Sequence, residues 1–193
     1  DLANQADKID TLLIASGVLH QADLQPEKNL GVLSSTTMQR LFNVNAAGPL
    51  AVLSKLQGPL KNSNHPKVVF LSAQVGSIED NHLGGWYSYR MSKAALNMGI
   101  KTAAIETARW RHPATIVAVH PGTTHTPLSK PFVTRRKAPV QSATVAGQRL
   151  QALIENLAPE QTGSFLTLAG ATLPWLMAPA SGHNSGYISG QPS

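Results

Sequence analysis

Residues 68–72 read Val-Val-Phe-Leu-Ser, and residues 84–97 read Gly-Gly-Trp-Tyr-Ser-Tyr-Arg-Met-Ser-Lys-Ala-Ala-Leu-Asn. The first stretch is a short apolar run of β-branched and aromatic residues, which predicts a buried strand. The second begins an alanine-rich pattern that predicts a long helix over residues 87–110. A buried strand followed by a long helix is the repeating unit of a parallel sheet that helices cover on both faces.

The same alternation continues on both sides of this unit. Short apolar runs predict further strands at residues 9–15, 115–119 and 164–168. Helical patterns cover residues 36–60 and 140–157, and residues 1–8 are expected to be the end of another helix. Gly48-Pro49 interrupts the 36–60 pattern and should kink or pause that helix. The sequence therefore predicts an α/β fold built on a doubly wound parallel sheet.

Composition limits the number of domains and the class of protein. The chain has 193 residues, of which 42% are hydrophobic and 13% charged, so we expect one domain with a sizeable core. That domain is expected to span residues 1–177. Residues 178–193 are rich in Gly, Ser and Pro and predict an irregular tail.

Several kinds of site and partner are not expected. The chain has no cysteine, which excludes disulfides, thiolate metal sites and cysteine nucleophiles, and its seven histidines show no paired metal-ligand spacing. The net charge of +6 comes from scattered basic residues without a nucleic-acid motif, so we expect no nucleic-acid partner. No run of 18 apolar residues and no apolar leader is visible, so we expect a cytoplasmic protein without a membrane span.

Tyr89 and Lys93 carry the chemistry that the helix over residues 87–110 suggests. Residues four apart share one face of a helix, about 6 Å apart along its axis. An ammonium beside a phenol favours the phenolate, so we expect Lys93 to lower the pKa of Tyr89 toward the range of a general acid or base. The pair also occurs by chance on many helices, and its surroundings must decide between the two interpretations.

Polar and small residues follow the predicted strands. Ser16-Gly17, Ser72 and Pro121-Gly122, the last with Thr124 and Thr126 behind it, come at or after the strand ends. Ligands of open α/β sheets bind outside the carboxyl ends of the strands, so these groups should converge with Tyr89 and Lys93. Asn45 lies in the middle of a predicted helix among small residues. It is either a surface amide or a residue required at a helix irregularity.

Five phrases in the chain resemble the classical short-chain dehydrogenases/reductases, and within them the carbonyl reductases of the C-factor and sniffer type. The phrases occur in the family's order over most of the chain: 42–45 Phe-Asn-Val-Asn, 75–78 Val-Gly-Ser-Ile, the 84–97 stretch quoted above, 120–126 His-Pro-Gly-Thr-Thr-His-Thr, and 162–165 Thr-Gly-Ser-Phe. The resemblance implies a Rossmann-like sheet and an oxidoreductase that interconverts a carbonyl and an alcohol, with NADP or NAD as cofactor.

The resemblance also implies a role for each matching residue. Tyr89 would be the general acid or base, Lys93 would lower its pKa and bind the nicotinamide ribose, and Asn45 would hold a water that links Lys93 to solvent. The remaining positions would border the cofactor together with Tyr89 and Lys93: Ser16, Gly17, Pro121, Gly122, Thr124 and Thr126. Relatives pair through two long helices, here residues 36–60 and 87–110, so we expect a homodimer or homotetramer.

Two departures from the family pattern affect the expected site. The family ends the strand before the tyrosine helix with two serines, but this chain has Ser72-Ala73. Either Ser77 or Ser72 would then have to replace the missing hydroxyl, which donates to the substrate oxygen. The family's Asn-Asn-Ala-Gly is Ile14-Ala15-Ser16-Gly17 here, so the glycine is kept and the two amides are lost.

A third departure concerns the nucleotide loop. The chain has no Gly-x-x-x-Gly-x-Gly phrase, whose backbone would hold the pyrophosphate at a helix N-terminus. We expect the N-terminal βαβ nucleotide-binding portion to lie upstream of Asp1, which would make this chain part of a longer polypeptide. The alternative is a degenerate relative that acts as a non-catalytic signalling or interaction protein.

Overall fold

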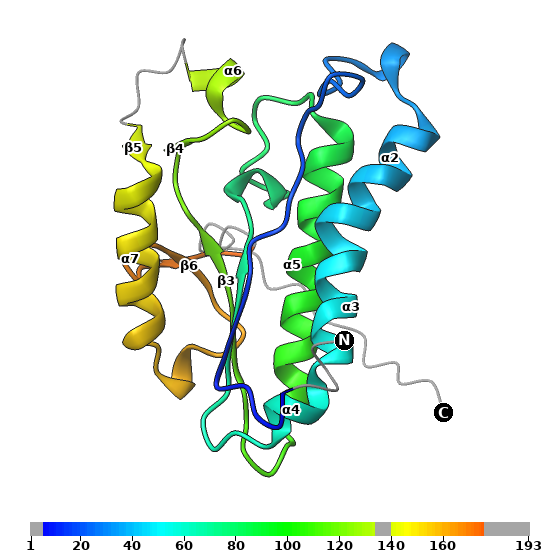
Figure 1. The fold of residues 1–193 in the computed structure, drawn as a ribbon. Helices are drawn as coiled ribbons and strands as arrows, with labels where there is room; N and C mark the ends of the chain where they lie inside the picture. Colours follow the sequence, from blue (N-terminus) through cyan, green and yellow to red (C-terminus); the bar gives the residue numbers. More distant parts are fainter. Residues whose placement is uncertain (1–5, 134–139, 176–193) are drawn as a thin grey trace, which may run out of the picture.

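A five-stranded sheet forms the centre of the fold in a computed structural model, which describes residues 6–133 and 140–175 (Figure 1). The strands lie in the order β1 (Thr11–Ile14), β2 (Lys67–Leu71), β3 (Thr115–His120), β6 (Phe165–Thr167) and β7 (Thr172–Leu173). The first four are parallel, and β7 runs antiparallel to β6. The predicted doubly wound parallel sheet is therefore present, with an antiparallel edge.

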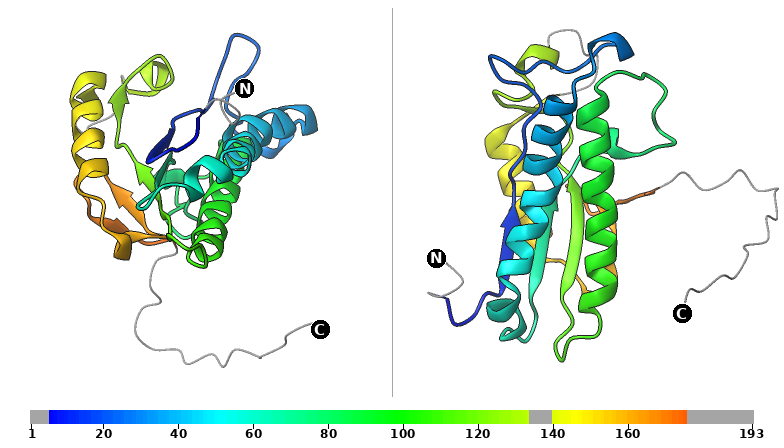
Figure 2. Two further views of the ribbon diagram at one scale, coloured as in Figure 1. Left: turned by 60° about the horizontal axis from the view of Figure 1, so that its bottom comes forward. Right: turned by 90° about the vertical axis from the view of Figure 1, so that its right-hand side faces the viewer.

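Helices cover both faces of the sheet (Figure 2). One face carries α2 (Ser35–Phe42), the π-helical turn η2 (Asn43–Ala47), α3 (Gly48–Lys55), α4 (Gln57–Lys61) and α5 (Tyr87–Thr107). The other face carries α7 (Ala143–Glu155). The remaining elements lie in the connections: η1 (Leu30–Val32), η3 (Gln74–Gly76), β4 (Thr124–His125), α6 (Lys130–Val133), β5 (Gln141–Ser142) and η4 (Pro159–Gln161).

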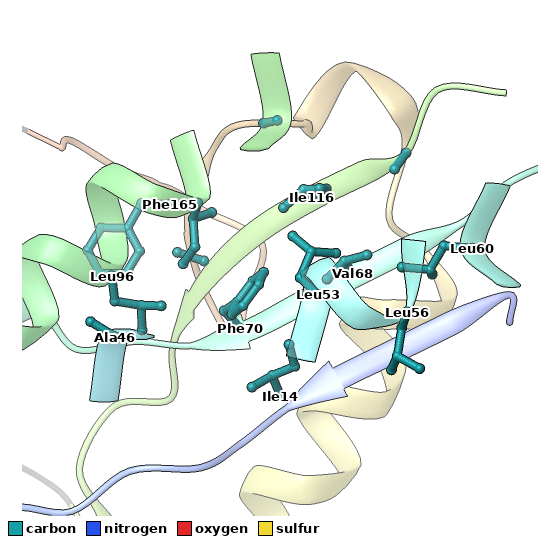
Figure 3. Packing of buried hydrophobic residues seen from close by; sticks show 14 residues of the cluster. Ile14, Ala46, Leu53, Leu56, Leu60, Val68, Phe70, Leu96, Ile116 and Phe165 are labelled. Carbon is teal, nitrogen blue, oxygen red and sulfur yellow. The ribbon is translucent and has the colours of Figure 1, made fainter. Parts of the chain in front are cut away.

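The period-two alternation of the strands divides the core into two layers. Val68 and Phe70 of β2 pack with α3 and α5 on one face (Figure 3). Val69 packs with α7 on the other face. Val68 lies beside Ile116 and Val69 beside Val117 in the parallel register, so equivalent faces of neighbouring strands join. Full burial of each such side chain contributes about 1.5–3 kcal/mol, which makes β2 and β3 the most strongly anchored strands.

Strand β1 is less well covered than β2 and β3. Within the described residues it pairs with β2 alone, and the Leu13 side chain on the α7 face is 43% exposed. Its neighbour Ile14, on the other face, is buried in the core. One edge and one face of the sheet are therefore open at β1.

Two sequence predictions about helices need correction. The helix expected over residues 36–60 was predicted to pause at Gly48-Pro49, but α3 begins at Gly48 and the irregularities lie elsewhere: a π turn occupies residues 43–47, directly before Gly48, and a break falls at Leu56. Residues 6–8 are not helical, contrary to the helix end predicted for residues 1–8. The predicted tail, residues 178–193, lies outside the described residues, as do residues 1–5.

Parallel strands bring all their carboxyl ends to one end of the sheet. The loop after β1, the loop after β2 with the first turn of α5, and the loop after β3 lie together at the upper end of the molecule in Figure 1. This is the end where ligands bind in open α/β sheets.

Candidate active site

Tyr89 and Lys93 lie in the first two turns of α5 and are both buried. Their side chains are 7% and 4% exposed, and the Lys93 Nζ atom lies 5.9 Å from the centroid of the Tyr89 ring. Lys93 Nζ donates a hydrogen bond of 3.1 Å to the Leu71 carbonyl at the end of β2. Burial of an ammonium costs free energy, so its place here is not explained by packing alone.

The pKa of Tyr89 differs from the sequence expectation. Burial raises the pKa of Tyr89 to about 12, because the phenolate loses hydration, and burial lowers the pKa of Lys93 to about 8. We expected Lys93 to lower the Tyr89 pKa, and that expectation is wrong for this structure. The ammonium lies over the ring and donates to a carbonyl, so desolvation is the larger effect and Tyr89 is a protonated phenol at neutral pH.

Asn45 is fully buried at the centre of the π turn, so of the two alternatives for this residue the structure shows the helix irregularity and not the surface amide. Its side chain accepts from the Val18 N–H at 2.7 Å and donates to the Val18 carbonyl at 2.9 Å and to Ser92 Oγ at 3.0 Å. Gly48 permits the turn, because a Cβ there would meet the Asn43 carbonyl oxygen at 2.9 Å. The π turn thus ties the loop after β1 to α5, one residue before Lys93.

Gly17 brings the end of β1 into this group. A Cβ at Gly17 would lie 3.5 Å from Lys93 Nζ and 3.7 Å from Asn45 Oδ1. Gly17 and Ser16 are exposed, whereas Lys93 and Asn45 are buried directly beneath. A polar ligand at Gly17 would therefore meet the ammonium and the amide without an intervening side chain, which is the chemistry that the hydroxyls of a ribose require.

The two candidate serines have different surroundings. The Ser72 hydroxyl donates to Asn97 Oδ1 at 2.5 Å, and its N–H donates to the Val119 carbonyl, so Ser72 joins β2, β3 and α5. Ser77 follows η3, and its hydroxyl accepts weakly from the Asp80 N–H at 3.4 Å. The adjacent Gly76 packs on the backbone of Lys93, where a Cβ would meet the carbonyl carbon at 2.9 Å. Ser72 is engaged inside the fold, while the segment of Ser77 lies against the Lys93 turn.

The loop after β3 is fixed by local hydrogen bonds. Gly122 has a φ of +70°, which favours glycine. Gln141 Nε2 donates to the Pro121 carbonyl at 2.5 Å and contacts Thr124 Oγ1 at 3.4 Å, next to the parallel β4–β5 pair. The Thr126 N–H is bound by Ser129 Oγ at 3.1 Å. These residues form the wall beside the β3 end, but no hydrogen bond joins them to Lys93 within the described part of the chain.

Residues that sequence reasoning did not select connect these loops. His20 Nε2 lies 3.2 and 3.1 Å from the Pro127 and Leu128 carbonyls and so joins the loops after β1 and β3. The Trp86 ring meets the Phe132 ring edge-on with centroids 4.8 Å apart, and it meets the Tyr89 ring at 6.2 Å. The Trp86 ring therefore lies between the Tyr89 ring and the Phe132 ring of α6.

Among residues 6–133 and 140–175, no three His, Asp or Glu side chains are arranged to hold a metal ion. None of the helices in those residues combines the length and apolar character that crossing a bilayer requires.

Comparison with known proteins places this arrangement in a family. The sequence model described as short chain dehydrogenase matches residues 1–137. C-signal of Myxococcus xanthus is 35% identical over 148 residues, which cover 76% of this chain and 83% of that protein. The chain belongs to the short-chain dehydrogenase family. Membership places it among oxidoreductases and agrees with the C-factor and sniffer-type group that the sequence phrases indicated.

Other relatives and solved structures of short-chain dehydrogenases agree. The 1-hydroxy-2-glutathionyl-2-methyl-3-butene dehydrogenase of Rhodococcus sp. (strain AD45) is 31% identical over 90% of this chain and 72% of that enzyme. The fold is similar to that of the carbonyl reductase Sniffer of D. melanogaster, with a TM-score of 0.75, 21% identity, and coverage of 88% of this chain and 67% of that one. An NADPH-bound carbonyl reductase from chicken fatty liver gives a TM-score of 0.76, 23% identity, and coverage of 89% and 68%.

Proposed function

We propose that this short-chain dehydrogenase interconverts a carbonyl and an alcohol in an NAD(P)-dependent reaction, with Tyr89 as the group that exchanges the proton. The observation that carries the proposal is the burial of Tyr89 and Lys93 side by side beneath the exposed Gly17, at the carboxyl end of the sheet. A neutral phenol and an ammonium have no packing reason to be buried together at this end.

The residues present fit the nicotinamide end of a dinucleotide. Lys93 and Asn45 offer a donor and an amide beneath Gly17, and the neighbouring Ser16 is exposed. Pro121, Gly122, Thr124 and Thr126 would border the ring and phosphates from the β3 side. When bound, a reduced nicotinamide supplies the hydride. The choice between NAD and NADP is left to the assay, although the similar chicken carbonyl reductase structure holds NADPH.

Tyr89 carries the proton that the reduction of a carbonyl requires, although burial makes it a weaker acid than a free phenol. With a pKa of about 12, the phenol keeps its proton at neutral pH and can donate a hydrogen bond to a carbonyl oxygen. As hydride reaches the carbonyl carbon, a C–H bond forms, the Tyr89 O–H bond breaks and its proton goes to the substrate oxygen. Charge that then develops on Tyr89 is stabilised by the Lys93 ammonium, 5.9 Å from the ring centroid.

Ser77 is the better candidate for a second donor to the substrate oxygen. Ser72 is committed to Asn97, whereas Ser77 makes one weak contact and lies beside the Gly76 turn that packs on Lys93. One preorganised donor contributes about 3 kcal/mol to transition-state stabilisation. We therefore expect Ser77→Ala to lower kcat more than Ser72→Ala. Equal values of kcat for the two variants would reject the choice of Ser77.

The surroundings of Tyr89 favour an apolar carbonyl substrate. Trp86 and Phe132 contact each other beside Tyr89, and Leu19, Leu24 and Leu41 are buried in the same cluster. Aromatic side chains provide apolar area that suits an aliphatic or aromatic aldehyde or ketone.

The test is loss of reduced-cofactor absorbance when the full-length protein, with any N-terminal nucleotide-binding portion included, is mixed with NADPH or NADH and a panel of such aldehydes and ketones. Wild type should turn over with at least one cofactor, and Tyr89→Phe should lose more than about 10³-fold in kcat while keeping its fold. Turnover of Tyr89→Phe at the wild-type rate would remove Tyr89 from the mechanism.

A second candidate is a non-catalytic signalling or interaction protein. It is favoured by Ala73 at the position of the family's substrate-binding serine and by the relative called C-signal. Calorimetric titration with NADPH and NADH separates the two functions, since binding of either cofactor in the micromolar range counts against a purely structural role.

Self-association through α3 and α5 is part of the proposal. Met91, Met98 and Ile105 recur at seven-residue spacing on α5 and are exposed, as is Val52 on α3. An apolar stripe on two packed helices is typical of a helix–helix interface between copies. Sedimentation velocity should find a dimer or tetramer that Met98→Glu dissociates; a wild-type monomer at micromolar concentration would contradict this.

A further inference from the structure

Glu27 is a buried carboxylate that the proposed reaction does not use. It lies in the loop between β1 and α2 and is 4% exposed. No ion pair holds it within residues 6–133 and 140–175, where the two ion pairs are Lys8–Asp10 and Arg40–Asp23. A buried carboxylate is tolerated only where hydrogen-bond donors replace its lost hydration, so its partners identify its role.

The donors come from the first turn of α5. Glu27 Oε2 accepts the Ser88 N–H at 3.3 Å, and Oε1 accepts the Ser88 hydroxyl in a short hydrogen bond. The residue at the N-cap position, Trp86, makes no side-chain cap of its own. Glu27 therefore caps α5 from 61 residues away in the sequence, and its charge is favourable at the positive end of the helix.

The backbone of Glu27 holds the turn that leads into α5. Three consecutive residues here have positive φ: +64° at Gly84, +63° at Gly85 and +54° at Trp86. Among the described residues, Trp86 is the only one other than glycine with a positive φ. Such a conformation costs a bulky residue about 1–3 kcal/mol, so something must hold it. The Glu27 carbonyl accepts the Trp86 N–H at 2.5 Å, and a Cβ at Gly85 would lie 3.3 Å from that oxygen.

Arg90 completes this arrangement from the opposite side. Its guanidinium donates to the Gly85 carbonyl at 3.1 Å, the Gly84 carbonyl at 3.3 Å and the Val75 carbonyl at 3.3 Å. The Gly84 and Gly85 carbonyls thus accept hydrogen bonds from the Arg90 guanidinium. The N–H groups of Trp86 and Ser88 donate to Glu27. The turn is therefore held by Glu27 from the loop before α2 and by Arg90 from α5.

We propose that Glu27 is a positioning residue for Tyr89, because it fixes the two residues that set the place of the phenol. Ser88 precedes Tyr89 in the chain, and the Trp86 ring packs edge-on against the Tyr89 ring. This inference rests on the proposed function, in which Tyr89 must meet a substrate oxygen. A shift of about 1 Å in such a group can cost about 100-fold in rate.

The test compares Glu27→Ala and Glu27→Gln with the control Asp23→Asn, which changes an exposed carboxylate on the same loop. Glu27→Ala should lower kcat by about 10- to 100-fold with less than about a twofold change in the cofactor KM. Glu27→Gln should lose less, because its amide oxygen still accepts the Ser88 N–H. Asp23→Asn should keep the wild-type kcat.

A second measurement does not depend on turnover. The absorbance change of phenolate formation at Tyr89 is isolated by subtracting the titration of Tyr89→Phe. Wild type should show little Tyr89 phenolate up to about pH 11, whereas in Glu27→Ala the turn opens, water reaches the ring and the midpoint of the titration moves toward about pH 10, its ordinary value. A purely structural role would lower the melting temperature without moving this titration.

The outcomes distinguish the alternatives. Glu27→Ala with a lower melting temperature but unchanged kcat and Tyr89 titration would overturn the proposal. If that variant does not fold, Glu27→Gln and Ser88→Ala decide, since each removes part of the contact; wild-type kcat and titration in both would also overturn it. If wild type shows no turnover with any carbonyl, the proposed function fails, and the titration still tests the effect of Glu27 on Tyr89.

Discussion

Helix α5 buries different kinds of side chain along its length. Its first two turns bury Ser88, Tyr89, Ser92 and Lys93, all of them polar or titratable. Its later turns bury Leu96, Ile100 and Ala104 in the core beside β2 and β3, with the polar residues Asn97 and Thr107 among them. Both parts of the helix are buried, so the chemistry of the buried side chains distinguishes them, and the extent of burial does not.

The difference separates stability from function within one element. Apolar burial in the later turns contributes about 1.5–3 kcal/mol per large side chain. Burial of Lys93 lowers the stability of the fold, because the charged ammonium loses its hydration; for the same reason its pKa falls to about 8. The first half of α5 is therefore held in place by the second half and by loops such as that of Glu27.

The largest stability effect is expected from the later turns. Ile100→Ala removes a fully buried side chain between α5 and the sheet, and should lower the free energy of unfolding by about 2–5 kcal/mol. Urea denaturation followed by circular dichroism measures it. Glu106→Ala is the control on the same helix, where the side chain is exposed and lies outside the apolar stripe of Met91, Met98 and Ile105. A similar loss in both variants would break the comparison.

A smaller effect of opposite sign is expected from the first turns. Lys93→Met removes a buried ammonium and should raise the free energy of unfolding at pH 7. The expected net gain is about 1–3 kcal/mol, once the cost of losing the hydrogen bond to the Leu71 carbonyl is subtracted. Turnover should be lost in the same variant. Equilibrium denaturation and the cofactor assay measure the two effects.

The sign of the pH dependence follows from the Lys93 pKa, which is about 8 in the fold against 10.5 in the unfolded chain. Between these values the unfolded chain binds more protons, so wild-type stability from this group rises with pH. The advantage of Lys93→Met should shrink as pH rises from 8 to 10.5. Lys101→Met, an exposed ammonium on the same helix, controls for the general loss of charge. If the stability difference between Lys93→Met and wild type does not change from pH 8 to 10.5, Lys93 is not a buried ammonium with a lowered pKa.

A third effect, of a size similar to that of Lys93→Met, concerns the packing of η3 on the first turns of α5. Gly76→Ala places a Cβ 2.9 Å from the Lys93 backbone, which cannot move aside easily, and should cost about 1–3 kcal/mol of stability. Gly99→Ala is the control: its Cβ would meet only the flexible end of Leu50, and alanine favours the helix. Thermal unfolding of both variants measures the difference, and equal melting temperatures would show that η3 can shift.

The strands and the long helix could be predicted because their patterns are local. All four parallel strands fall within a few residues of their predicted bounds, and α5 begins at Tyr87 as expected. The short strands β4, β5 and β7 were missed, because two residues carry no periodic pattern. The break at Leu56 was missed for a similar reason, since apolar spacing continues across it.

The sequence predicted which residues form the candidate site, but it did not predict the pKa of Tyr89. Tyr89, Lys93, Asn45 and Gly17 do lie together, because strand ends and helix starts converge in this topology. The direction of the Tyr89 pKa shift was not predictable, because it depends on how deeply the ring is buried. Glu27 was missed because a lone glutamate in a polar loop gives no sequence signal of burial.

The π turn at residues 43–47 makes this helix one residue longer than a regular α-helix through the same points would be. Deleting one residue there would give a regular α-helix and would keep α2 and α3 on their present faces. The widened turn that carries Asn45 would then be lost, and with it the hydrogen bonds of Asn45 to Val18 and Ser92. Protein engineers who shorten or align this segment should therefore treat its length, as well as its residues, as fixed.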